Sequence, residues 1–82
     1  MSKSEIIETL SEFSVSYRTG RQLEVTDDLI NFLEKIAPDF NQNDILKKNF
    51  STILMAILDC QSREDWLGLA DYLEHDLVQL LK

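Results

Sequence analysis

The sequence predicts an all-α fold, an antiparallel up-down-up-down four-helix bundle that makes residues 1–82 a single domain. Apolar residues recur at spacings of three and four along four separate segments, as they do on one face of a helix. The chain has only 2 glycines and 1 proline, so the connections must be short, and helices joined by short connections pack antiparallel. The predicted helices cover residues 4–18, 21–37, 43–61 and 63–81.

The first predicted helix, 4–18, has a polar start and a glycine after its end. Ser4 is the expected N-cap, because its hydroxyl can accept a backbone N–H that the first turn leaves unpaired. Gly20 tolerates the left-handed backbone that commonly ends a helix. The apolar stripe between them consists of Ile6, Ile7, Leu10, Phe13 and Tyr17.

The second predicted helix has two candidate starts. Thr19 and Gln22 fit a capping box and favour a start at 21, whereas Thr26, followed by two acids, favours a start at 26. We prefer the earlier start, because helical spacing already holds for Leu23, Ile30, Leu33 and Ala37. Pro38 ends this helix, since proline disfavours helical geometry in the residue before it.

The third predicted helix, 43–61, contains the unbroken apolar run Ile53–Leu58 and is expected to be the central helix. Asn41 or Asn43 is the expected cap, and Phe40 is expected to fold back onto the bundle. The fourth helix should begin after Ser62, with Asp65 completing a capping box. The predicted core is Ile7, Leu10, Phe13, Tyr17, Leu29, Leu33, Ile36, Phe50, Ile53, Leu54, Ile57, Trp66, Leu69, Ala70, Leu73, Leu77 and Leu80.

The charge and the cysteine content limit the partners and the compartment. Eight Lys and Arg against fifteen Asp and Glu give a net charge of −7, which disfavours binding to nucleic acid or to an anionic membrane. The charge is explained by solubility, or alternatively by mimicry of nucleic acid. A lone Cys60 excludes an intramolecular disulfide and favours the cytoplasm. The sequence shows no signal peptide and no membrane span.

The most suggestive group for chemistry is Asp71, Glu74 and His75. Residues 71 and 75 are four apart, a spacing that suits two metal ligands on one helix face. Di-iron bundles require two Glu-x-x-His pairs, however, and this chain has one histidine. The group also lies opposite the apolar stripe, so we interpret it as a solvated face. We expect Cys60 to be a small buried apolar residue. The sequence therefore predicts no catalytic, cofactor-binding or metal-binding residue and no cofactor.

One apolar side chain of the third helix is left outside the predicted core. Met55 shares a face with Thr52 and Asp59, and Ala56 lies beside it. Scattered exposed apolar residues are common. The competing interpretation is a two-fold homodimer in which this helix packs on its own copy. The candidate interface is thus Met55, Ala56, Thr52 and Asp59.

The segment Asp65–Leu77 is similar to a stretch found in small, uncharacterised helical proteins of bacteria. The matching residues are Leu69-Ala70-Asp71, Leu73-Glu74 and Asp76-Leu77, while His75 stands where that pattern has an aromatic residue. The resemblance implies an all-helical bacterial domain without an assigned function.

These observations favour a non-enzymatic protein–protein interaction module that self-associates and binds another protein. The first alternative is a small secretion- or assembly-type chaperone that binds an amphipathic helix in a groove. The others are a metal-binding bundle enzyme that uses Asp71, Glu74 and His75, and a mimic of nucleic acid.

Overall fold

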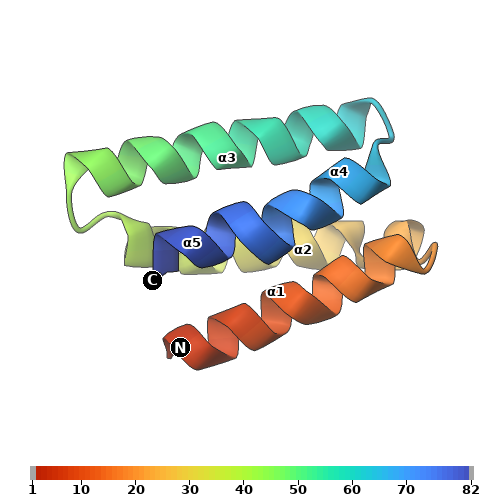
Figure 1. The fold of residues 1–82 in the computed structure, drawn as a ribbon, viewed down its shortest axis with the longest axis horizontal. Coiled ribbons are helices and arrows are strands. Elements are labelled where there is room, and N and C mark those ends of the chain that lie inside the picture. The colour runs from red at the N-terminus through yellow and green to blue at the C-terminus, as the bar shows by residue number, and fades with distance from the viewer. Residues whose placement is uncertain (1, 82) are drawn as a thin grey trace.

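The computed structural model describes residues 2–81, and within them it contains four helical rods and no strand. The rods run alternately up and down (Figure 1), which confirms the predicted fold class. Within this described part, the rods are α1 (Lys3–Arg18), α2 (Gln22–Ile36), α3 (Asp44–Ser62) and a fourth rod made of α4 (Trp66–Asp71), the π-helical turn η2 (Tyr72–Asp76) and α5 (Leu77–Leu81). A short 3-10 helix, η1 (Ala37–Phe40), follows α2.

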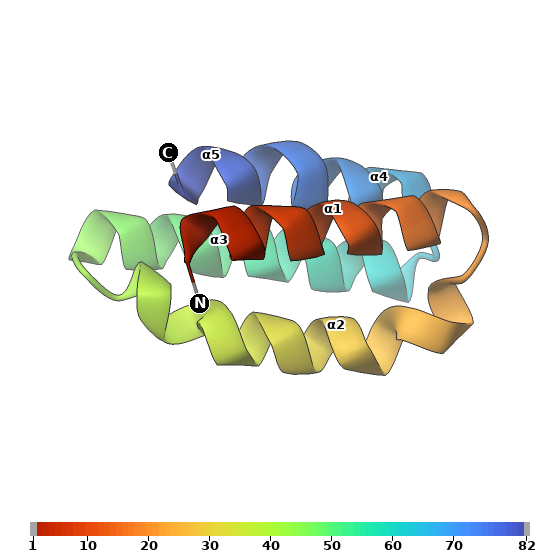
Figure 2. The ribbon, with the colours of Figure 1, turned by 90° about the horizontal axis from the view of Figure 1, so that it is seen from below.

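In cross-section the rods lie at the corners of a diamond, with α2 opposite the fourth rod (Figures 1 and 2). The fourth rod packs against both α1 and α3, α2 packs against α1, and η1 packs against α3. Within residues 2–81 no helix is both long and apolar enough to cross a membrane.

The starts of the first two helices differ from the predicted caps. Ser2, not Ser4, caps α1 by accepting the Glu5 N–H at 3.2 Å, because the helix extends one residue further toward the N-terminus. The early start of the second helix is confirmed at Gln22, but the predicted capping box is wrong. The hydroxyl of Thr19 instead donates to the Val15 carbonyl at 2.9 Å, so it completes the end of α1.

The turns before and after α2 agree with the predictions made from the sequence. Gly20 has a φ of 81°, the left-handed geometry that was expected after the first helix. Pro38 lies just beyond the end of α2, within η1. Phe40 is buried and stacks on Phe50 with ring centroids 4.4 Å apart. The cap of α3 is Asn43, whose side chain accepts the N–H of Leu46 at 2.7 Å.

The start of the fourth rod is a correction. Ser62 is the last residue of α3 rather than a cap, and Asp65 takes that role by accepting the Gly68 N–H at 3.1 Å. The chain reverses through Glu64, which has a φ of 57°. Gly68 suits this cap because a Cβ there would lie 2.5 Å from a carboxylate oxygen of Asp65.

The core confirms most of the prediction, with two shifts by one residue. Ile6 is buried in place of Ile7, because α1 packs between α2 and the fourth rod and buries the stripe that continues through Leu10. Leu81 is buried in place of Leu80, since a π-helical turn closes i→i+5 and holds more residues than an α turn. Consequently the buried face of the fourth rod continues by fours: Leu69, Leu73, Leu77 and Leu81. The predicted core residues that are only partly buried are Ile7, Phe13, Ile53, Leu54, Trp66 and Leu80.

Candidate binding groove and polar cluster

An apolar groove of about 180 Å³ lies between α2 and α3. On the side of α2 and η1 its wall is apolar except for one carboxylate, and the α3 wall consists of two leucines. The side chains that line it are Ile30, Leu33, Glu34, Ala37, Leu54 and Leu58. Leu58 is 45% exposed, while Ile30 and Leu54 are partly buried, so the groove opens to solvent.

The groove exists because α2 stays apart from α3 along much of its length. The connection from Ala37 to Asn43 is longer than the turns at residues 19–21 and 63–65. It brings η1 against α3, whereas α2 itself makes its close approach to α1. A long connection relaxes the requirement that consecutive helices pack side by side.

The apolar wall of α2 extends beyond the groove. Ile30 and Ala37 are seven residues apart, and Leu23 precedes Ile30 by the same interval, which places all three on one side of the helix. Leu23 is 91% exposed. Sequence reasoning assigned these residues to helical spacing but did not identify them as a groove wall. The available signal was that this row lies beside, and not within, the buried stripe of Leu29, Leu33 and Ile36.

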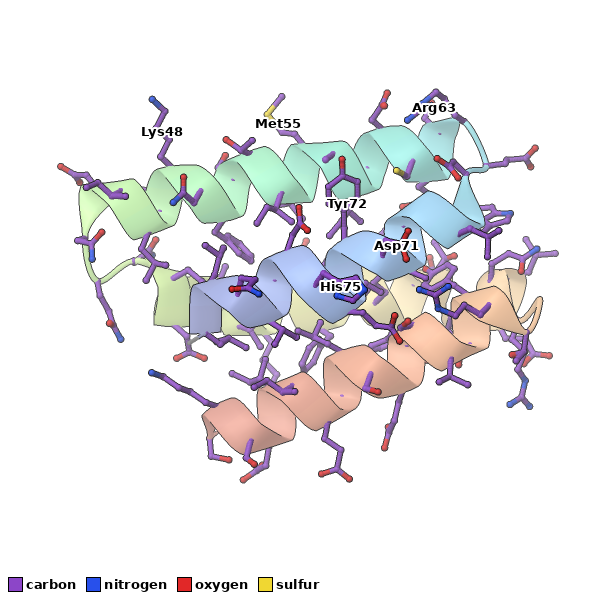
Figure 3. All side chains as sticks on the ribbon, in the orientation of Figure 1. Lys48, Met55, Arg63, Asp71, Tyr72 and His75 are labelled. Carbon is purple, nitrogen blue, oxygen red and sulfur yellow. The ribbon has the colours of Figure 1, made fainter. Side chains whose placement is uncertain are left out.

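Met55, which belongs to the predicted interface on α3, points away from the other helices (Figure 3). Met55 is 68% exposed, Thr52 and Asp59 are exposed, and Ala56 is partly buried. Near the end of the same helix, Asp59 Oδ2 accepts a hydrogen bond from Arg63 Nε at 3.0 Å. Met55 therefore lies on a largely polar face, and the homodimer stays a prediction.

The polar cluster on the fourth rod includes a partner that the sequence analysis did not identify. Arg18 Nη2 lies 2.7 Å from Asp71 Oδ1 and 2.8 Å from Glu74 Oε2. Both hydrogen bonds raise the pKa of Arg18 above its ordinary value, and the bond to Asp71 has the larger effect. The Nε2 of His75 is 3.9 Å from Glu74 Oε2. Arg18 lies far from the cluster in sequence, so no local spacing indicates the contact.

This cluster has the ligand spacing of a metal site but is already occupied by a cation. One ligand atom each from Asp71, Glu74 and His75 lies within 4.8 Å of the others. A divalent ion would have to displace the guanidinium of Arg18 from both carboxylates. The arrangement instead joins the end of α1 to the fourth rod. Asp71 and His75 are exposed, as a solvated face requires.

A polar hollow of about 440 Å³ lies between the end of α3 and the fourth rod. Cys60 at its edge is 3% exposed, so the expected burial is confirmed. The pKa of the Cys60 thiol is raised mainly by burial and, to a smaller extent, by the negative charge of Asp65. Because the thiolate is the nucleophilic form, this cysteine is poorly suited to covalent chemistry. Asp71, Tyr72 and His75 also line the hollow, and Tyr72 points toward α3 (Figure 3).

Comparisons with protein-family models, with curated proteins and with solved structures gave no significant match.

Proposed function

We propose that this chain is a non-enzymatic protein-interaction module that holds one amphipathic helix of another protein in the groove between α2 and α3. The observation that carries the proposal is the groove itself, whose walls are apolar except for Glu34. Amphipathic helices bind in such grooves through apolar side chains spaced three, four and seven residues apart. The proposal agrees with the chaperone-type interpretation of the sequence.

The polar groups of the molecule support binding rather than catalysis. Arg18 engages both Asp71 and Glu74, and burial raises the pKa of Cys60. Among residues 2–81, the apolar side chains of Leu23 and Leu58 are exposed to solvent. Apolar surface that gathers at a groove is typical of a binding site.

The first experiment uses a synthetic 18-residue peptide with leucines on one helical face and glutamine elsewhere. Titration of this peptide into ¹⁵N-labelled protein should shift the amide resonances of Ile30, Ala37, Leu54 and Leu58. A Leu58→Asp substitution should weaken binding by about tenfold or more, because burial of a leucine side chain contributes about 1.5–3 kcal/mol.

Met55→Asp is the matched control, since Met55 is also exposed and lies on α3 but outside the groove lining. This variant should bind the peptide as the parent does. Loss of binding in Met55→Asp with retention in Leu58→Asp would contradict the proposal and favour the outer face of α3. Sedimentation equilibrium of the unliganded protein adds a second check: a dimer that Leu58→Asp dissociates would assign the groove to a second copy.

A further inference from the structure

The outer edge of the α2 wall is acidic. Asp27 and Glu34 each follow an apolar wall residue by four positions, Leu23 in the first case and Ile30 in the second. The two acids are therefore seven residues apart, about 10 Å along the same side of the helix. Both are exposed, and Glu34 also lines the groove.

The two carboxylates are available to a partner. Within residues 2–81, neither lies at ion-pair distance from a lysine, an arginine or the histidine of this chain. By contrast, Glu24 on the same helix pairs with Arg21 at 3.4 Å. An apolar row with a parallel acidic row beside it is the arrangement by which helices select a partner with opposite charges at the flanking positions.

The α3 edge of the groove has a different character. On α3, the exposed positions beside Leu54 and Leu58 are Ser51 and Ser62, which are uncharged. At the end where α3 begins, Lys47 lies seven residues before Leu54 and Asp44 lies seven residues before Ser51, so the two charges oppose each other. The groove therefore has one acidic edge along α2 and one edge along α3 without net charge.

From this asymmetry we infer that the groove selects a basic amphipathic helix, with lysine or arginine along the edge that faces Asp27 and Glu34. The inference rests on the proposed function and adds to it the chemistry of the partner. Basic residues of that helix lie over α2, and its apolar stripe enters between Ile30 and Leu58. A partner with glutamates at those positions is rejected by like-charge repulsion.

The test uses three 18-residue peptides with identical leucine positions and with lysine, glutamine or glutamate elsewhere. Fluorescence anisotropy should rank their affinities for the parent protein as lysine, then glutamine, then glutamate. The double variant Asp27→Lys, Glu34→Lys should lower the ratio of lysine-peptide to glutamate-peptide affinity by about tenfold or more, since two exposed ion pairs are exchanged for repulsive pairs.

A second double variant, Glu8→Lys and Glu12→Lys, is the charge-matched control on α1. Each pair of substitutions changes the net charge from −7 to −7 + 4 = −3. An equal loss of preference in both variants would overturn the inference, because overall charge and not the acidic edge would then decide.

The remaining outcomes separate the two proposals. Equal affinity of all three peptides, lost on Leu58→Asp, would overturn the charge inference and leave the groove function standing. Absence of groove shifts with every peptide would overturn both.

Discussion

Between residues 2 and 81, two residues hold their backbone in the left-handed region, and only one of them is a glycine. Gly20 has a φ of 81° after α1, and Glu64 has a φ of 57° between α3 and α4. A side chain in this region brings its Cβ close to the backbone carbonyl, which costs about 1–2 kcal/mol. The turn after α3 therefore contains local strain that the turn after α1 avoids.

Glu64→Gly should raise the free energy of unfolding by about 0.5–1 kcal/mol, because glycine adopts this conformation without the steric cost and loses part of that gain to chain entropy. Gly20→Ala should lower it by about 1 kcal/mol, although its Cβ would meet no atom within 4 Å. Urea unfolding monitored by circular dichroism measures both. A decrease in stability for Glu64→Gly would show that the turn depends on this side chain.

These two turns show what local sequence predicts and what it does not. Glycine at position 20 indicates the first turn directly. The second turn has no glycine, and Ser62 with Asp65 matched the pattern of a capping box. Three residues separate α3 from α4, and Asp65 is the acceptor that reaches the Gly68 N–H. The helix therefore starts later than predicted.

At the scale of an element, the fourth rod differs most from its prediction. It was expected as one regular helix over 63–81, with a buried face at Trp66, Ala70, Leu73, Leu77 and Leu80. The π-helical turn at Tyr72–Asp76 accommodates additional residues in one turn and moves the buried face to Leu81. The spacing of apolar residues predicted the rod and its central leucines. The number of residues in each helical turn depends on packing against α1 and α3, which the spacing does not show.

The buried face of this rod can be tested with two leucines. Leu73 is fully buried, and Leu67 is 61% exposed. Leu73→Ala should lower the free energy of unfolding by about 2–5 kcal/mol, through lost burial and a cavity. Leu67→Ala should change it by less than about 0.5 kcal/mol. Chemical denaturation of both variants provides the comparison, and similar losses for the two would contradict the described burial.

At the scale of the whole molecule, the buried thiol of Cys60 and the buried phenol of Tyr17 make the free energy of unfolding depend on pH in the alkaline range. Burial raises the pKa of the Cys60 thiol above its ordinary value of 9.0. Burial also raises the pKa of the Tyr17 phenol above 10.0, and its hydrogen bond with Thr26 partly opposes that shift. The folded state therefore holds both protons more tightly than the unfolded state does.

Consequently the contribution of these groups is fully present below pH 9 and is lost as the pH rises through the raised folded pKa values. The free energy of unfolding should fall progressively above pH 9 and continue to fall beyond pH 10. Denaturation at a series of alkaline pH values checks this. The double variant Cys60→Ala, Tyr17→Phe should show a shallower decline, and an unchanged slope would assign the effect to other groups.

The position of the groove depends on the whole molecule, and the spacing of apolar residues along the sequence did not predict it. Spacing correctly assigned Leu33, Leu54 and Leu58 to apolar helix faces. It does not specify how far α2 lies from α3, because that distance depends on the connection through η1. For the same reason the sequence pointed to Met55, whose exposure is confirmed, while the neighbouring apolar surface lies on the side of Leu58.

The separation of α2 from α3 also affects the motions of the chain. Arg21 gives α2 no side-chain cap, and within residues 2–81 the buried Oε1 of Gln22 has no hydrogen-bond partner. Helices with few tertiary supports open at lower free energy than the rest of a domain. We therefore expect α2 to move relative to α3, and its amide hydrogens to exchange with solvent before those of α3. The width of the groove would then adjust to the helix it receives.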